Sequence, residues 1–272
     1  MANPTLKAVL LSPERPLGEH PLLVVGSSLG TSSVLWARTA SLLGDSVDVV
    51  AWDLPGHGMS PAATDPFDVP ALATAVVDLI DSFAPGQAFH YAGVSLGGAV
   101  GLQLGIAHGD RVKSLSIQCS GAKLGTPEGW RDRAETVRTQ GTPVMIQGSA
   151  ERWFAPGFMD SEPELSSRLL HVLRDADRFS YAHCCEALAA YDVRSELETI
   201  TVPTQAVAGR EDVAAPPALA EEIVDGINSG GGTASSVILE GVAHLAPAEA
   251  PGHVAELLRG LIAHTESSGA LR

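Results

Sequence analysis

The sequence GVSLG at residues 93–97 limits most strongly what this chain can fold into. It follows an apolar run (88–94) typical of a buried strand and precedes a helical pattern (97–109). A G-x-S-x-G motif between a strand and a helix is typical of a sharp turn that exposes a nucleophilic serine. The motif alone also arises by chance, so the partners of Ser95 elsewhere in the chain must decide its interpretation.

Three glycines around one serine indicate a constrained backbone, because glycine weakens both a strand and a helix start. We expect Ser95 to have a positive φ, with Gly93 and Gly97 removing collisions on either side of it. Gly98 would let the helix pack close to the strand. The predicted result is a hydroxyl exposed at the carboxyl end of a sheet, where the amides of a helix start also point.

Short apolar runs alternate with helical patterns along most of the chain, which predicts an α/β fold with a mostly parallel sheet. The predicted strands cover residues 6–12, 21–27, 47–53, 88–94, 112–120, 202–209 and 235–241. The predicted helices between and after them cover residues 36–44, 70–83, 97–109, 216–227 and 253–264.

The alternation stops in residues 123–190, which contain helical stretches and no convincing strand. We therefore expect an α/β core in residues 1–122 and 191–272, with residues 123–190 inserted between two core strands as a helical cap. Composition also predicts a flexible loop at 228–236 and a frayed tail at 266–272.

A serine nucleophile needs a general base and an acid that orients it, in the chain order Ser, Asp or Glu, His for this type of sheet. Asp212 follows the predicted strand 202–209, and His244 follows the predicted strand 235–241. Both therefore lie on loops at the edge of the sheet that carries Ser95. Glu211 is the alternative acid, and Asp212 is preferred.

The other histidines considered lie in less suitable places. His57, in the loop DLPGHGMS, precedes Ser95 and is interpreted as a turn residue. The remaining ones fall inside a strand (His90), at a helix end (His108) or in helical stretches (His171, His183, His253 and His264).

The oxyanion formed by nucleophilic attack needs two N–H donors. One should be the N–H of Leu96, directly after the nucleophile. The second should be the N–H of Leu29, in the loop GSSLG after the predicted strand 21–27. The alternative is that GSSLG is only a flexible turn.

The charge and composition of the chain exclude several kinds of partner. A net charge of −15 over 272 residues argues against binding to nucleic acid or to an anionic membrane. The first residues lack a signal peptide pattern, and no apolar run is long enough for a membrane helix. The three cysteines have neither a disulfide nor a zinc spacing. We expect a cytoplasmic enzyme that needs no metal.

These motifs resemble the α/β-hydrolase superfamily over the whole chain, with DLPGHGMS similar to its D-x-x-G-x-G-x-S loop. Within it the chain most resembles the 3-oxoadipate enol-lactonases of the β-ketoadipate pathway. The matching runs are SSLGTSSVLW, GVSLGG, GAKLGTPEGWRDRAETVRTQG, ERWFAPGF, YAHCCEAL and GREDVAAPP. One departure is Ser27-Ser28, where the superfamily more often has His-Gly and these lactonases have Asn-Ser.

The resemblance implies hydrolysis of 3-oxoadipate enol-lactone, a small molecule, in aromatic catabolism and without a cofactor. The substrate carries a carboxylate, which the acidic chain would repel, so a local cation must bind it. The segment from Lys123 to Arg178 holds eight of the 17 Lys and Arg residues. Arg133 and Lys123 are the candidates, Trp130 lies near them, and Trp153 either lines the pocket or packs in the core.

Other activities share the same three residues, so alternatives remain. They are an esterase, a hydrolase that cleaves carbon–carbon bonds, and a cofactor-free perhydrolase. A non-catalytic ligand receptor of the same fold is a further alternative. The sequence does not indicate the oligomeric state.

Overall fold

All seven predicted strands form one sheet in the computed structural model, which describes residues 3–12 and 17–269. The strand order is β1-β3-β2-β4-β5-β6-β7. Strand β1 pairs antiparallel with β3, and every other pair is parallel, so the predicted mostly parallel sheet is confirmed. The strands are β1 (Lys7–Leu10), β2 (Leu22–Gly26), β3 (Asp48–Asp53), β4 (Phe89–Val94), β5 (Val112–Gln118), β6 (Thr204–Gly209) and β7 (Ala234–Leu239).

The five helices predicted between and after the strands are present as α1, α2, α3, α9 and α11. The α-helices are α1 (Ala37–Leu43), α2 (Val69–Asp81), α3 (Leu96–Ala107), α4 (Pro127–Gln140), α5 (Ile146–Trp153), α6 (Phe158–Ser161), α7 (Pro163–Asp175), α8 (Arg178–Ala190), α9 (Pro217–Ser229), α10 (Ala246–Glu249) and α11 (Pro251–Gly269). Short 3₁₀ helices cover Ser33–Trp36, Gly44–Ser46, Thr142–Met145 and Arg194–Thr199.

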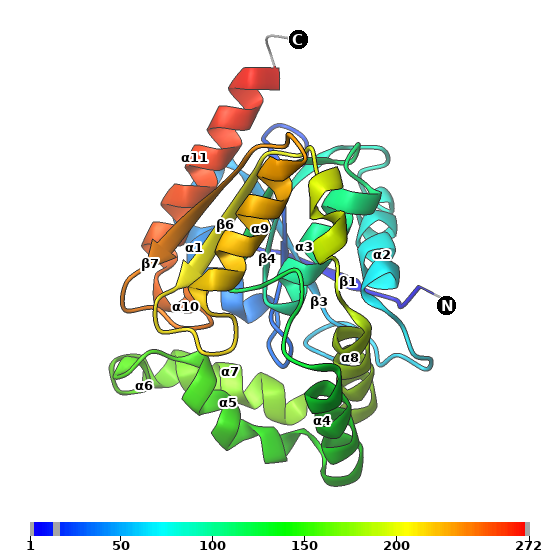
Figure 1. Ribbon diagram of the computed structural model, residues 1–272. Coiled ribbons are helices and arrows are strands. Elements are labelled where there is room, and N and C mark those ends of the chain that lie inside the picture. The colour runs from blue at the N-terminus through cyan, green and yellow to red at the C-terminus, as the bar shows by residue number, and fades with distance from the viewer. Residues whose placement is uncertain (1–2, 13–16, 270–272) are drawn as a thin grey trace.

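Helices cover both faces of the sheet (Figure 1). Helix α3 packs against β4 and β5, α9 packs against β6 and β7, and α1 packs against α11. Strands β2, β3 and β4 are buried along their whole length. Their mostly apolar sequences follow from this, because a parallel sheet with two covered faces has no solvent-exposed side.

The helices α4 to α8 all lie between β5 and β6 in the sequence and form a layer at the carboxyl ends of the strands (Figure 1). Residues 123–190 contain no strand. Helix α4 starts at Pro127, and the Thr126 side chain accepts a hydrogen bond from the Gly129 N–H at 3.1 Å. The division of the chain into a core and an inserted cap stays a prediction.

The loop predicted at 228–236 is shorter than expected, because only residues 230–233 lie between a helix and a strand. Helix α9 runs to Ser229 and β7 begins at Ala234. The Asn228 side chain closes the turn between them, because it accepts from the Ala234 N–H at 2.8 Å and donates to the Ala234 carbonyl at 3.1 Å. These hydrogen bonds between a side chain and the backbone could not be predicted from the composition of the segment.

The predicted frayed tail, 266–272, is also partly helical, because α11 continues to Gly269. The Glu266 carboxylate accepts from Lys113 Nζ at 2.7 Å and lies 2.9 Å from Nε2 of the buried His90. These contacts hold the end of α11 against β4 and β5. Residues 270–272 lie outside the described part of the chain.

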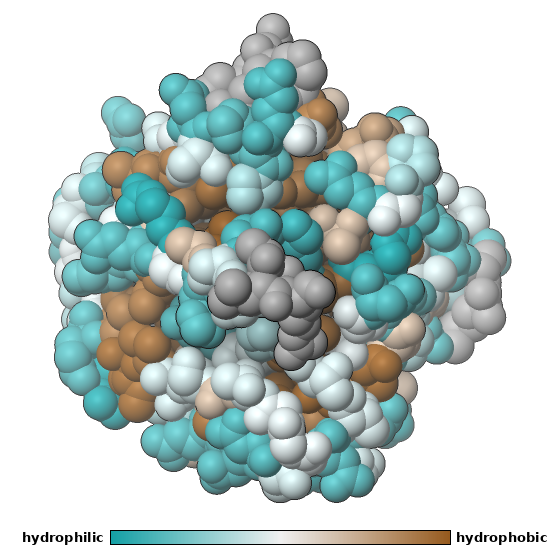
Figure 2. Space-filling view, turned by 90° about the horizontal axis from the view of Figure 1, so that it is seen from above, coloured by the Kyte–Doolittle hydropathy of each residue, from teal (hydrophilic) through white to brown (hydrophobic). Residues whose placement is uncertain are grey.

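The end of the molecule away from α4–α8 exposes hydrophilic residues with smaller hydrophobic areas between them (Figure 2). Among the helices of residues 3–12 and 17–269, none is both long enough and apolar enough to cross a membrane. The predicted catalytic residues gather at the opposite end, where the strands meet the layer of helices.

Candidate active site

Ser95 lies in the turn between β4 and α3, with φ 56° and ψ −116°. This is the positive φ expected of the motif, and residues other than glycine rarely adopt a positive φ. The Ser95 N–H donates to the Gln118 carbonyl at 3.0 Å, which fixes the turn to the end of β5. The side chain therefore projects beyond the carboxyl end of the sheet.

The glycines around Ser95 permit three close contacts, two with backbone atoms and one with a side chain. A Cβ at Gly93 would lie 2.2 Å from the Gly97 carbonyl oxygen, which is the predicted collision across the turn. A Cβ at Gly97 would lie 2.6 Å from the Gly26 backbone, at the end of β2. A Cβ at Gly98 would lie 2.5 Å from the Ser120 Cβ, just after β5. Helix α3 can therefore begin close to the ends of β2 and β5, the strands on either side of β4.

Gly93→Ala should lower the free energy of unfolding by about 3 kcal/mol or more, because the added Cβ meets a backbone oxygen at 2.2 Å. Urea unfolding measures this change. Gly260→Ala in α11 is the matched control, since no described atom lies within 4 Å of its added Cβ. That variant should be about 0.5–1 kcal/mol more stable. An equal response of the two variants would contradict the steric account of the turn.

His244 and Asp212 lie together on the loops that follow β7 and β6. His244 Nδ1 is 2.8 Å from Asp212 Oδ2, and both side chains are buried. Asp212 Oδ1 accepts from the N–H groups of Ala214 and Ala215 at 2.8 and 2.9 Å. The alternative acid, Glu211, is exposed and has no hydrogen bond to His244 among the described residues. The geometry therefore supports Asp212 as the partner of the imidazole.

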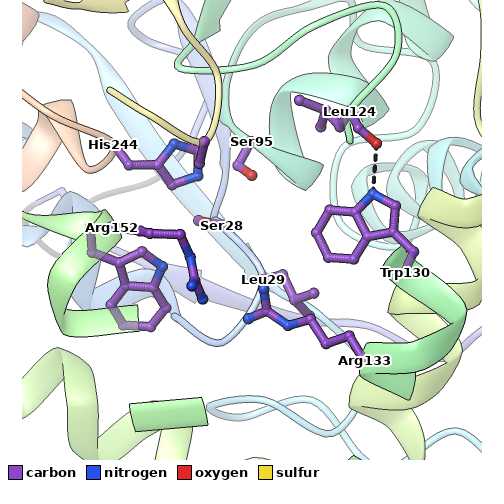
Figure 3. A pocket seen from close by; sticks show the side chains of 10 residues that line it. Ser28, Leu29, Ser95, Leu124, Trp130, Arg133, Arg152 and His244 are labelled. Carbon is purple, nitrogen blue, oxygen red and sulfur yellow. Dashed lines mark hydrogen bonds between the residues drawn. The ribbon is translucent and has the colours of Figure 1, made fainter. Parts of the chain in front are cut away.

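Ser95 and His244 line the same pocket, and Figure 3 shows the imidazole directed toward the Ser95 side chain. Because Asp212 accepts from Nδ1, Nε2 is the ring nitrogen that can accept a proton. Within the described chain the Ser95 hydroxyl has no hydrogen-bond partner. The arrangement allows the hydroxyl to be activated by His244 when substrate is bound.

The two predicted oxyanion donors are the backbone N–H groups of Leu29 and Leu96. Both residues are buried, at 4% and 0% exposure. Neither N–H donates to any other residue within the described part of the chain. Buried N–H groups normally have partners, so two unpaired ones beside a serine support a site for a developing negative charge.

His57, interpreted from sequence as a turn residue, also holds the loop that contains Leu29. Its side chain is buried, and Nδ1 lies 2.9 Å from the Pro55 carbonyl, so the proton is on Nδ1. Nε2 then accepts from the Gly30 N–H at 3.2 Å. Burial lowers the pKa of His57, which keeps the ring neutral and able to accept. The imidazole stacks on Tyr181, which belongs to α8.

The pocket beside Ser95 is lined by both aromatic and cationic side chains (Figure 3). Its lining residues are Ser28, Leu29, Ser95, Leu124, Trp130, Arg133, Arg152, Trp153, Ala214 and His244. Trp130 Nε1 donates to the Leu124 carbonyl at 2.6 Å, which fixes the ring. Three of the four residues predicted to bind substrate, Trp130, Arg133 and Trp153, thus lie in this pocket.

Arg133 lies between two aromatic rings, with Cζ 5.5 Å from the centroids of both Trp130 and Tyr181. Its guanidinium donates to the Tyr181 hydroxyl, and Nε is buried without a partner among the described residues. No described carboxylate forms an ion pair with Arg133. The guanidinium is held in place and keeps donors available for an anion.

Arg152 is a pocket residue that the sequence analysis missed. It also forms no ion pair with a described carboxylate. Burial, followed by the nearby charge of Arg133, lowers the pKa of Arg152, whereas the charge of the adjacent Glu151 opposes that shift. Two neighbouring cations without ion-pair partners indicate a site for an anionic group. Its position beside Trp153 in the run ERWFAPGF was the available signal.

Lys123 does not reach the pocket. Its ammonium pairs with Asp192 at 3.1 Å, and it is absent from the residues that line the cavity. The short distance in sequence between Lys123 and Trp130 suggested a shared site, but the Lys123 ammonium binds Asp192, just after α8. We therefore do not propose Lys123 as a substrate anchor.

Known proteins similar to this chain are hydrolases, which agrees with the arrangement of Ser95, His244 and Asp212. The sequence profile of the Alpha/beta hydrolase family matches residues 22–257. The chain is 36% identical over 194 residues to 3-oxoadipate enol-lactonase 2 of Acinetobacter baylyi, covering 71% of this chain and 72% of that protein. It is 29% identical over 216 residues to the pimeloyl-acyl-carrier-protein methyl ester esterase of Vibrio cholerae, covering 76% and 82%.

A solved structure shows the same architecture over nearly the whole length. The crystal structure of the enol-lactonase from Burkholderia xenovorans LB400 superposes with a TM-score of 0.88 at 30% identity, covering 95% of this chain and 96% of that one. The strand order, the turn at Ser95 and the matched profile agree with one another. The chain therefore belongs to the α/β hydrolase family.

Proposed function

We propose that this hydrolase opens a carboxylate-bearing lactone, 3-oxoadipate enol-lactone, to give 3-oxoadipate. The observation that carries the proposal is the pocket itself, which is lined by Ser95 and His244 and by Arg133 and Arg152, neither of which forms an ion pair with a described carboxylate. The net charge of −15 would otherwise repel an anionic substrate. The names of the Acinetobacter and Burkholderia relatives agree with this substrate class.

In the proposed first step, Ser95 Oγ attacks the lactone carbonyl while His244 Nε2 takes its proton. Asp212 holds the imidazole by accepting from Nδ1, at 2.8 Å, and stabilises the imidazolium that forms. The N–H groups of Leu29 and Leu96 donate to the oxyanion. Collapse then breaks the ring carbon–oxygen bond and releases an enolate, which is a better leaving group than an alkoxide.

The second step must prevent the ring from closing again, because the leaving group stays attached to the acyl-enzyme. The His244 imidazolium gives its proton to the enolate, and tautomerisation of the resulting enol to the ketone removes that internal nucleophile. The neutral His244 then takes a proton from water as the water oxygen attacks the acyl group, and it returns this proton to Ser95 Oγ as the acyl–Oγ bond breaks. Base and oxyanion donors all come from protein groups, so the proposed reaction needs no metal.

Arg133→Ala should lower kcat/KM for the lactone about ten- to a hundredfold, because it removes a charge-assisted hydrogen bond to the substrate carboxylate. Hydrolysis of a neutral aryl acetate should change much less. Arg152→Ala should likewise lower kcat/KM for the lactone much more than for the aryl acetate. Steady-state kinetics with both substrates measures the difference.

Arg131→Ala is the matched control, because Arg131 lies on the same helix but is exposed and pairs with Glu128. It should leave both activities unchanged. An equal fall for lactone and aryl acetate in Arg133→Ala would mean that Arg133 only braces Trp130 and Tyr181. That result would remove the physical reason to prefer an anionic lactone.

An acyclic ester is the second candidate substrate, and similarity to a methyl ester esterase favours it. The ratio of kcat/KM for the lactone to that for simple esters separates the two. Absence of turnover with every ester would instead indicate a receptor of the same fold.

A further inference from the structure

The loop that carries His244 is hydrogen-bonded to the segment at the end of α5. The His244 N–H donates to the Trp153 carbonyl at 3.2 Å. The Ala155 N–H donates to Glu249 Oε2 at 2.7 Å, across 94 positions of sequence. Two chain segments that are distant in sequence are thus joined directly at the catalytic histidine.

Glu249 accepts hydrogen bonds from both segments. Its Oε1 accepts from the Leu245 N–H at 3.1 Å, and both oxygens lie 3.2 Å from the Ala243 nitrogen. The carboxylate therefore binds the backbone on either side of His244 as well as Ala155. Burial raises the pKa of Glu249, and these three N–H groups oppose that shift by stabilising the charged form.

The segment bound by Glu249 is also a wall of the pocket. Arg152 and Trp153, three and two positions before Ala155, both line the cavity with Ser95. Displacement of Ala155 would therefore move the guanidinium that we assign to the substrate carboxylate. The same displacement would break the bond between the His244 N–H and the Trp153 carbonyl.

We propose that Glu249 is a positioning residue that couples the Arg152–Trp153 wall of the pocket to His244. This rests on the proposed role of His244 as the general base. The carboxylate fixes both backbones at once, so the anion site and the imidazole are correctly placed together. A carboxylate suits this role because its two oxygens can accept hydrogen bonds from several N–H groups. When ionised, it has no donor that would face those N–H groups.

Glu249→Gln should lower kcat about ten- to a hundredfold for the lactone and for a neutral aryl acetate. The amide has a single acceptor oxygen, so its NH₂ group would face one of the N–H donors. The loop at His244 must then shift, and a displacement of about 1 Å can reduce the rate 10²-fold. KM should rise for the lactone only, because Arg152 moves with Ala155. Glu256→Gln, at an exposed position of α11, is the matched control and should change neither constant.

Two measurements report the coupling without turnover. The Nδ1 proton of His244, shared with Asp212, should give a downfield proton resonance that shifts or broadens in Glu249→Gln. The Ala155 and Leu245 amides should exchange with deuterium at least about tenfold faster in that variant. An unchanged kcat together with an unchanged resonance would overturn the proposal and leave Glu249 a structural residue.

The wild-type protein decides the question if Glu249→Gln does not fold. A shared acceptor predicts that the Ala155 and Leu245 amides open together, with closely similar protection factors. Protection that differs by a hundredfold or more would mean that the two segments move independently, and would overturn the coupling. Absence of lactone hydrolysis in the wild type would count against the proposed function, whereas the exchange data would still decide the role of Glu249.

Discussion

Ser95→Ala should lower kcat by about 10⁶-fold, the loss typical when the nucleophile of a serine hydrolase is removed. The hydroxyl is the atom that forms the covalent intermediate, and no neighbouring group can replace it. His244 would remain bonded to Asp212, but it would have no hydroxyl to deprotonate. Steady-state turnover of the lactone and of an aryl acetate should fall together.

The same variant should fold as the wild type does. Ser95 Oγ makes no hydrogen bond within the described chain, and the positive φ of the turn is unchanged by the substitution. The midpoint of urea unfolding and the circular dichroism spectrum check this. Full activity in Ser95→Ala would contradict the assignment of the nucleophile.

Asp212→Asn should lower the rate on the order of 10⁴-fold. The asparagine amide can donate to Nδ1, which favours the tautomer with its proton on Nε2 and so removes the base. Asp212 Oδ1 also accepts from two loop N–H groups, so the loop can keep its conformation through the amide oxygen. Single-turnover kinetics separates this chemical loss from any change in binding.

Glu211→Gln is the control for that substitution. Glu211 is exposed, and no hydrogen bond joins it to His244 in the described structure. Its activity should stay close to that of the wild type. A severe loss in Glu211→Gln with a mild one in Asp212→Asn would mean that the acid is the neighbouring residue.

The features that could be predicted from the sequence were those that depend on residues close together in the chain. The buried strands have short apolar runs, such as residues 22–26 and 49–52, and the helices between them have their own periodicity. The turn at Ser95 was predictable because its glycines lie within three positions of it. The loops of Asp212 and His244 followed from the rule that parallel strands end at one edge of a sheet.

Residues whose roles depend on long-range contacts were not predictable in this way. His57 bonds to Gly30, and Glu249 bonds to Ala155, far away in the sequence. Arg152 differs from most arginines of residues 123–190 in lining the pocket with Arg133, which no periodicity shows. Lys123 was misplaced for the same reason, because its partner Asp192 lies beyond the helical segment.

The most direct test of the account is the loss of enol-lactone ultraviolet absorbance when purified wild-type protein or Ser95→Ala is added. The account predicts a fast loss with the wild type and, with Ser95→Ala, a rate equal to that of buffer alone. Equal loss with both proteins would contradict Ser95 as the nucleophile. No loss with the wild type, while it hydrolyses a neutral ester, would contradict the lactone as the substrate.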